Sequence, residues 1–287
     1  MKIASYLDYY DWSLDKQLNL FKLNELDQFI LRHVNGKPFL SYLDKVNKYI
    51  FLLKKIKVGL FDPMLPPIDL DNEEIVVNLN KAVSFAKKIK TKNIVIQIKT
   101  FNEKEILTEE LETYFKSITK ITKRLNVLIR VDNENEMFLF NKIANEIKNR
   151  KIKLIYNPAL IYQKGYSPDA AYRLFNKKMT LFELADTNSD KKAILVGYGV
   201  IDIRELFKNL YEDRFKGLIT LNSNLDEVFK NFGINPNEVV RKEKKEARQK
   251  YLETIHKLGY IDLYSKKEVP FEDIIAHQIK LLKIVFK

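Results

Sequence analysis

Residues 193–222 read AILVGYGVIDIRELFKNLYEDRFKGLITLN, the pattern of a short strand, a glycine turn, a helix, a second glycine turn and a second strand. Three of the eight glycines of the chain lie in this stretch, at Gly197, Gly199 and Gly217. Asp202 is followed three residues later by Glu205, which resembles a capping box and predicts a helix that begins near Ile203. A strand–helix–strand unit of this size implies parallel strands joined by a right-handed crossover.

The rest of the chain alternates strand-like and helix-like segments in the same way. We expect strands at Ile3–Leu7, Gln28–Arg32, Lys57–Phe61, Ile94–Ile98, Val127–Val131, Lys153–Tyr156, Thr180–Leu184, Ala193–Val196 and Gly217–Leu221. The clearest helical patterns are Glu73–Lys90 and Thr108–Lys123. Several of the strands are almost continuous apolar runs, which is typical of parallel strands covered on both faces. The alternation predicts an α/β fold, and 287 residues suit a single α/β barrel.

The composition narrows the classes of function. There is no apolar run long enough to span a membrane, no signal-peptide layout at the N-terminus and no cysteine. The lack of cysteine excludes disulfides, thiol nucleophiles and cysteine-bound zinc, and we expect a cytoplasmic protein without a membrane partner. The net charge of +12 comes mainly from lysine, with only nine arginines, so we expect solvated helix faces and no specific nucleic-acid partner.

After Asn222 the pattern changes. Asn235-Pro236 opens a charged helix that continues to Leu258, and residues 271–286 form a second, amphipathic helical pattern. We predict a barrel over residues 1–230 and a C-terminal helical extension over residues 231–287, packed on the barrel or on the partner of a homodimer. A nucleic-acid or coiled-coil role for the basic residues 241–250 is the alternative to a solvated face.

Residues 193–222 also resemble the last βα unit of the xylose-isomerase-like TIM barrels, the superfamily of sugar-phosphate isomerases and epimerases and of endonuclease IV. That family has a Gly-x-Gly-x-x-Asp turn, a helix and a Gly-Trp/Leu-Ile-x-x-Glu strand. The matching residues here are Gly197, Gly199 and Asp202 for the turn and 217–221 for the strand. The resemblance implies a single (β/α)8 barrel in which 217–221 is the eighth strand and 193–196 a short lead-in. At the family's glutamate position this chain has Asn222, so it resembles a divergent member.

Polar side chains follow the expected strands where they end, and function in a βα barrel gathers at the C-terminal ends of the strands. In chain order these side chains belong to Asp8, Arg32, His33, Asn35, Asp62, Gln97, Lys99, Arg130, Asp132, Asn133, Asn157, Glu183, Asp186 and Asn222. Their convergence predicts a pocket for a small polar ligand.

The resemblance implies positions for a divalent metal. Related enzymes bind it through Glu, Asp, His and Glu after strands five to eight, where this chain has Asp132, Asn157, Glu183 and Asn222. Asn222 cannot act as a base, because an amide does not accept a proton at neutral pH. Asp132 and Glu183 remain as candidate catalytic residues and metal ligands of a degenerate metal site. We expect no metal, or a weakly bound Mg²⁺ or Mn²⁺, and with only three histidines no endonuclease-type zinc cluster.

The remaining strand-end residues are candidates for ligand binding. Asn157 and Asn222 would bind hydroxyl groups, and Arg32, His33 and Asp186 would contact the same ligand. Trp12, with Tyr9 and Tyr10, resembles a stacking surface for a sugar ring. The alternatives are a packing role for His33, a helix-capping role for Asp132 and Asp186, and loop aromatics that only cover the barrel. The turn at Gly197 and Gly199 could also present helix N-terminal amides to a phosphate.

These residues, with the resemblance, indicate a sugar or sugar-phosphate isomerase or epimerase. The alternative is a catalytically inactive barrel that binds a carbohydrate or a protein, which the missing carboxylates support. A nucleic-acid-binding or repair protein is the third class. It is supported only by the net positive charge and by the resemblance to a superfamily that includes endonuclease IV. The sequence leaves open whether the protein is an enzyme, because fold does not decide function.

Overall fold

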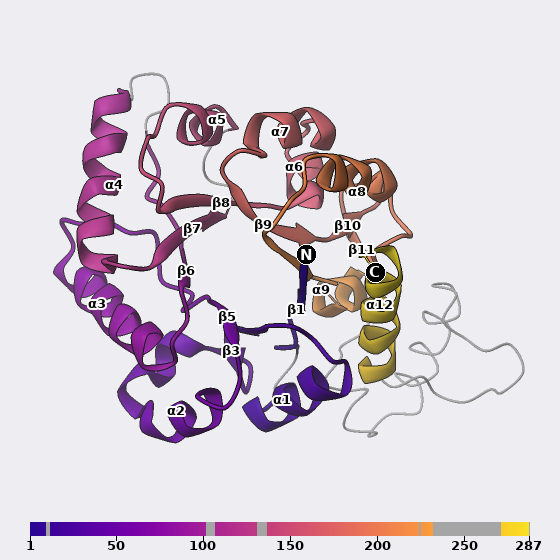
Figure 1. The fold of residues 1–287 in the computed structure, drawn as a ribbon, viewed down its shortest axis with the longest axis horizontal. Helices are drawn as coiled ribbons and strands as arrows, with labels where there is room; N and C mark the ends of the chain where they lie inside the picture. Colours follow the sequence, from indigo (N-terminus) through magenta and orange to yellow (C-terminus); the bar gives the residue numbers. More distant parts are fainter. Residues whose placement is uncertain (10–11, 102–106, 131–136, 224, 232–270, 287) are drawn as a thin grey trace, which may run out of the picture.

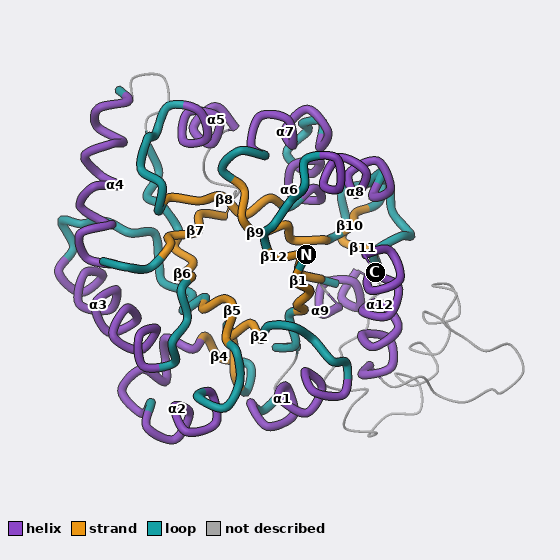
Figure 2. Tube along the Cα trace, viewed as in Figure 1, coloured by secondary structure: helices purple, strands orange, loops and turns teal. Residues whose placement is uncertain are grey.

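The computed structural model describes residues 1–9, 12–101, 107–130, 137–223, 225–231 and 271–286. Eight parallel strands surround a central axis and helices form an outer layer, as in a (β/α)8 barrel (Figures 1 and 2). In spatial order the strands are β1 (Lys2–Ser5), β12 (Leu218–Leu221), β9 (Met179–Leu184), β8 (Ile152–Tyr156), β7 (Asn126–Arg130), β6 (Asn93–Ile96), β5 (Val58–Phe61) and β2 (Phe29–Leu31). The ring is nearly closed, because Ile3 at one edge exchanges two hydrogen bonds with Asp27, just before β2.

The outer layer contains the helices that the sequence indicated. The expected Glu73–Lys90 and Thr108–Lys123 are α3 (Glu73–Lys88) and α4 (Thr108–Thr122). The other described helices before residue 232 are α1 (Leu14–Leu23), the 3-10 helix η1 (Phe39–Lys45), α2 (Asn47–Leu53), α5 (Met137–Asn145), α6 (Pro158–Gln163), α7 (Pro168–Phe175), α8 (Ile203–Glu212) and α9 (Leu225–Asn231). In the described part of the chain, no helix is both long enough and apolar enough to cross a membrane.

Residues 193–222 contain the predicted strand, turn, helix and strand, but the expectation that the two strands are parallel and joined by a crossover is wrong, because the first strand pairs antiparallel with residues 186–187 outside the barrel. Helix α8 begins at Ile203, and the Asp202 side chain caps it by accepting a hydrogen bond from the backbone N–H of Glu205. Strand β12 pairs in parallel with both β1 and β9, so it is the eighth barrel strand. The lead-in is β11 (Ala193–Ile194), which pairs only with β10 (Asp186–Thr187) in a two-stranded ribbon outside the barrel. A second ribbon joins β3 (His33–Val34) to β4 (Lys37–Pro38).

The barrel interior is a packed apolar layer to which every strand contributes. Its buried members are Ala4, Tyr6, Ile30, Leu60, Val95, Leu128, Ile155, Leu181 and Leu218. Successive side chains of a strand point to opposite faces, so the residue two positions later lies on the same inner face, one step closer to the C-terminal end. This rule places Arg32, Asp62, Arg130, Asn157 and Glu183 above the layer.

The C-terminal segment returns to the barrel wall. Helix α12 (Phe271–Phe286) forms as predicted and lies beside β11 and α8 (Figure 1). The Gln278 side chain bonds to both the N–H and the C=O of Val196, and the Phe286 and Phe207 rings are 4.4 Å apart. The predicted helix from Asn235 to Leu258, with the basic residues 241–250, lies outside the described residues, so the division at residue 230 stays a prediction.

Candidate functional site

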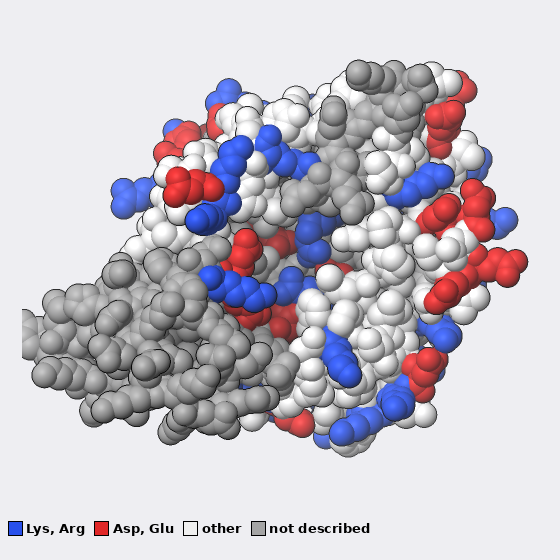
Figure 3. Space-filling view, turned by 180° about the vertical axis from the view of Figure 1, so that it is seen from behind, with Lys and Arg blue, Asp and Glu red and all other residues white. Residues whose placement is uncertain are grey.

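Charged side chains gather at the centre of the barrel, in the hollow that Figure 3 shows from the side opposite to Figure 1. A cluster of ion pairs above the apolar layer contains Asp8, Arg32, Asp62, Arg130 and Glu183, which come from five different strand ends. The three carboxylates are almost fully buried, whereas the two arginine side chains keep 17–18% of their surface exposed. Strand alternation therefore brings two cations and three anions together above the apolar layer.

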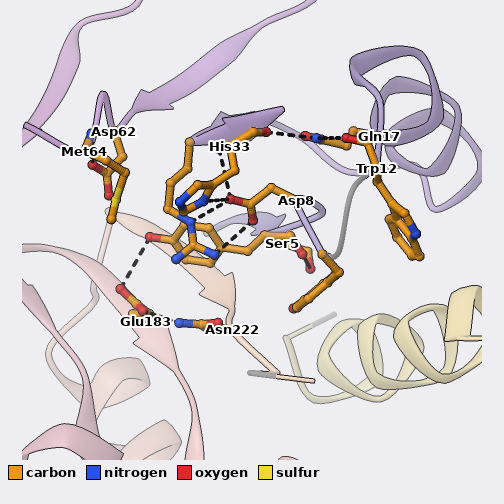
Figure 4. Close-up of polar contacts among 12 residues, drawn as sticks. Ser5, Asp8, Trp12, Gln17, His33, Asp62, Met64, Glu183 and Asn222 are labelled. Atoms are coloured by element: carbon orange, nitrogen blue, oxygen red, sulfur yellow. Dashed lines mark hydrogen bonds and ion pairs between the residues drawn. The ribbon is translucent and has the colours of Figure 1, made fainter. Parts of the chain in front are cut away.

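Asp8 is the acceptor for the first half of this cluster (Figure 4). Its Oδ2 lies 2.7 Å from Nε of Arg32 and its Oδ1 lies 3.0 Å from Nη2, which makes a bidentate pair. The same Oδ2 is 2.8 Å from Nδ1 of His33 and accepts the His33 backbone N–H. Burial alone raises the pKa of Asp8, but Arg32 and the hydrogen bonds from His33 and Arg32 outweigh burial and hold this pKa well below its usual range.

Glu183 is the acceptor for the second half. Its Oε1 accepts hydrogen bonds from Nδ2 of Asn222, at 2.6 Å, and from Nδ2 of Asn157, at 3.3 Å. Its Oε2 accepts from Nε of Arg130 and from the Tyr6 hydroxyl. Both carboxylate oxygens are thus surrounded by donors. The predicted residues Asn157, Glu183 and Asn222 do lie together.

Arg130 and Tyr6 connect the two halves. Arg130 donates from Nη1 to Oδ2 of Asp62 (3.1 Å) and from Nη2 to the Tyr6 hydroxyl (2.9 Å). The Arg32 guanidinium carbon lies over the Tyr6 ring, 4.2 Å from its centroid. Burial and the nearby Glu183 raise the pKa of Tyr6 far above its ordinary value, so the hydroxyl stays protonated and can donate to Glu183.

One acceptor at this site has no partner. Asn222 is 6% exposed, and its Nδ2 is turned toward Glu183 (Figure 4). Its Oδ1 is buried and accepts no hydrogen bond from the described residues. By contrast, Oδ1 of Asn157 accepts the backbone N–H of Leu160 and so caps α6. A buried acceptor without a donor is unfavourable by about 1–3 kcal/mol, so Asn222 Oδ1 marks a place where a ligand hydroxyl or a water would bond.

Asp186, predicted to contact the ligand, instead holds the loop that precedes α8. Its Oδ1 accepts the backbone N–H of Thr187 and Ile201, and its Oδ2 accepts those of Gly197 and Gly199. Burial raises the pKa of Asp186, and these four N–H donors oppose that rise. Gly197 has a φ of 91°, and a Cβ on Gly199 would lie 2.0 Å from the carboxylate.

This arrangement corrects one expectation about the glycine turn. The turn could have presented helix N-terminal amides to a phosphate, but Asp186 already accepts hydrogen bonds from the N–H groups of Gly197 and Gly199. The alternative in which Asp186 caps the following helix is also not what the structure has, because Asp202 caps α8. Gly199 is required by its close contact with the Asp186 carboxylate, and Gly197 by its positive φ.

One further predicted residue, Trp12, lies away from the cluster. Trp12 is 6% exposed and is set apart from Asp8, His33 and Glu183 (Figure 4). Its ring packs edge-on against Tyr9 and carries the Lys16 ammonium 4.1 Å from its centroid, so it offers no open stacking face. Asp132, predicted as catalytic and metal-binding, lies outside the described residues, as does Tyr10.

The described residues do not fit a divalent metal at this site. Among them, no three His, Asp or Glu side chains are grouped closely enough to hold a metal ion. Glu183 faces four hydrogen-bond donors, and Asn157 turns its nitrogen, not its oxygen, toward that carboxylate. A metal such as Mg²⁺ needs oxygens at about 2.0–2.1 Å around one point, and a guanidinium occupies the space between Asp62 and Glu183 instead.

Sequence reasoning named several of these residues without giving them a role. Asp8, Asp62 and Arg130 were recognised only as strand ends, and Tyr6 was placed inside the first strand. The available signal was the alternation of strand residues, since Tyr6 follows Ala4 and Arg130 follows Leu128 by two positions on the inner face.

Comparisons with known proteins identify the fold. No protein-family model and no curated protein sequence matches the chain. Among solved structures, the IolI protein with a bound zinc atom matches with a TM-score of 0.63 at 16% identity, over 92% of this chain and 100% of that one. A D-psicose 3-epimerase with D-tagatose, from Clostridium cellulolyticum H10, matches with a TM-score of 0.58 at 14% identity, over 90% and 99%.

A third structure, the probable 3-DHS dehydratase AsbF from Bacillus anthracis, has a TM-score of 0.62 at 11% identity, over 85% of this chain and 100% of that one. Other matches are described as a xylose isomerase domain protein and as a fusion that contains a xylose isomerase-like TIM barrel. These identities are low, so the comparison concerns the fold alone. The chain has the fold of the xylose isomerase-like TIM barrels, as the resemblance of residues 193–222 implied.

Proposed function

We propose that this protein binds a small polyhydroxy ligand of the sugar class above the apolar layer of the barrel, and acts on it as an isomerase or epimerase. The observation that carries the proposal is Asn222 Oδ1, a buried acceptor without a donor beside a ring of buried charges. A sugar hydroxyl can donate to this oxygen and accept from a neighbouring guanidinium at the same time. The solved epimerase structures of the same fold support this class of ligand.

His33 is the group we assign to proton transfer among the described residues. An ionised Asp8 accepts hydrogen bonds only, so the Nδ1 that faces it carries the proton. Nε2 then has a free lone pair and forms no hydrogen bond within the described residues, while 25% of the side chain is exposed. An imidazole held in one tautomer by a buried carboxylate, with its second nitrogen free to accept a proton, suits general acid–base work. Asp132 stays a predicted partner in this chemistry.

The second candidate is a barrel that binds a carbohydrate without turning it over. One observation favours it: both oxygens of Glu183 already accept hydrogen bonds from within the chain. A carboxylate so engaged is a poor base, because a proton or a substrate must first displace one of its donors. On this reading Glu183 and Arg130 are fixed parts of the pocket wall.

The test is a ligand-observed NMR screen of aldoses, ketoses and their phosphates, followed by incubation of each binder in D2O. Solvent deuterium in a recovered sugar demonstrates proton abstraction, and binding without exchange selects the inactive barrel. We expect Asn222→Ala to lose ligand binding and His33→Gln to keep binding but lose exchange. Asn80→Ala, an exposed helical change, serves as the control. Absence of binding to every sugar of the panel would refute both candidates.

A further inference from the structure

We propose that the guanidinium of Arg130 is the resident cation of this site, placed where a divalent metal would otherwise neutralise the carboxylates, and that the site works without a metal. The inference rests on the location of the proposed function but not on a sugar ligand. It follows from the misfit between the described residues and a metal, and from what surrounds Arg130.

Three oxygen atoms of the chain surround the guanidinium of Arg130 and form its oxygen shell. Its three nitrogens each meet a different oxygen: Nε meets Glu183 Oε2 at 3.3 Å, Nη1 meets Asp62 Oδ2 at 3.1 Å, and Nη2 meets the Tyr6 hydroxyl at 2.9 Å. These oxygens come from three separate strand ends and spread around a planar ion. A metal would require them to converge on one point at a shorter distance. The shell is therefore built for a guanidinium.

The charge balance of the site also depends on Arg130, which neutralises two buried carboxylates. Arg32 is bidentate with Asp8, so the other two buried carboxylates, Asp62 and Glu183, rely on Arg130. Their side chains are 4% and 2% exposed, and a buried carboxylate without a cation is strongly unfavourable. A divalent ion added beside Arg130 would bring like charges together, so each of the two cations excludes the other.

Arg130 also keeps donors for a ligand. A guanidinium has five N–H groups, and three of them make the bonds described above. The remaining N–H on Nη1 and the one on Nη2 can hold a carbonyl or hydroxyl oxygen, since 17% of the side chain is exposed. Arginine does not lose its proton in proteins, so this positive charge is permanent across the working pH range.

The experiment is a titration with Mn²⁺ alone, followed by electron paramagnetic resonance and calorimetry. The unmodified protein should show no stoichiometric Mn²⁺ binding at micromolar metal. Arg130→Gln leaves Asp62 and Glu183 without their cation, and its Kd for Mn²⁺ should be at least about tenfold lower than that of the unmodified protein. Adding Glu183→Gln to Arg130→Gln should remove the gain. Arg173→Gln, which breaks an exposed helical ion pair, should change nothing.

Two outcomes overturn the proposal. One is tight Mn²⁺ binding by the unmodified protein that Glu183→Gln weakens, because metal and Arg130 would then coexist. The other is a folded Arg130→Gln that binds Mn²⁺ no better than the unmodified protein. If circular dichroism shows that Arg130→Gln does not fold, the unmodified protein and its Glu183→Gln variant still decide the matter. A failed sugar screen leaves the titration untouched, so the two proposals fail separately.

Discussion

His33 and Asp8 are joined side chain to side chain, with Nδ1 of the imidazole 2.8 Å from Oδ2 of the carboxylate, at adjacent strand ends. The same Oδ2 also accepts the backbone N–H of His33 and the Nε–H of Arg32. Three donors on one oxygen fix the ring, the guanidinium and the strand end relative to one another. Asp8 is therefore the residue whose loss should disturb the site most.

Replacement of Asp8 by alanine should destabilise the fold by about 3–5 kcal/mol, because it leaves the mostly buried Arg32 without its counter-ion. Urea unfolding at neutral pH measures this loss. Asp44→Ala, which removes the exposed partner of Lys81, is the matched control and should change stability by less than about 1 kcal/mol. Equal effects of the two substitutions would contradict the importance given to burial.

The low pKa of Asp8 also predicts an acid dependence. The folded pKa lies below the ordinary value of 3.8, so the unfolded state takes up the proton first as the pH falls. The stabilisation is complete well above the ordinary value and is lost progressively as the pH falls from that value through the lower folded pKa. Urea midpoints measured down this range should fall more steeply for the unmodified protein than for Asp8→Asn. Parallel curves would show that Asp8 does not titrate as argued.

Asn222→Asp should be destabilising at neutral pH by about 2 kcal/mol or more. The substitution places a second carboxylate where an amide nitrogen lies 2.6 Å from Oε1 of Glu183, and two ionised carboxylates at this distance repel. One of them must hold a proton, so the pKa of the pair rises. A raised folded pKa gives stability at low pH that is lost as the pH increases. The variant should approach the stability of Asn222→Ala at acid pH, which thermal melts at several pH values will measure.

Tyr6→Phe should cost about 1–2 kcal/mol, since the hydroxyl accepts from Arg130 and donates to Glu183 in a buried position. The ring and its contact with Arg32 remain. Tyr211→Phe, on a residue that is 77% exposed, is the control and should be neutral. Chemical denaturation compares the two, and a neutral Tyr6→Phe would mean that the hydroxyl adds nothing to the network.

Gly199→Ala should destabilise the loop before α8 by about 1–3 kcal/mol, because its Cβ would lie 2.0 Å from Oδ1 of Asp186 and 2.3 Å from the carbonyl oxygen of Thr187. Val200→Ala, at a neighbouring position that is 45% exposed, is the control. Amide hydrogen exchange should show faster exchange at residues 197 and 201 in the Gly199 variant, because their N–H groups lose the carboxylate. Unchanged exchange there would contradict the packing argument.

The barrel was predictable because its causes are local and repeated. Apolar runs at regular spacing, and the turn and cap of residues 193–222, depend on neighbouring residues, and each became the expected element. The strand-end rule also brought Asn157, Glu183 and Asn222 together correctly.

What the sequence could not supply was the pairing across strands. Nothing near Arg130 in the chain indicates that its partners are Asp62 and Glu183, each more than fifty residues away. The same holds for Trp12, whose burial depends on tertiary packing. The turn at Gly197 has the spacing of an anion site, but the anion comes from Asp186, eleven residues earlier.

The Asp186 carboxylate competes with any dissolved anion for the backbone amides of this loop. A tethered group acts at an effective concentration that a free ion reaches only at millimolar levels or above. Dissolved phosphate therefore competes poorly with Asp186 for these amides. While Asp186 holds these amides, they are not available to a phosphate group. A single change, Asp186→Gly, would remove the competitor and open the position to added formate or phosphate. If added formate or phosphate restores the stability of the Asp186→Gly variant, the concentration that is needed measures how well each anion binds at this position.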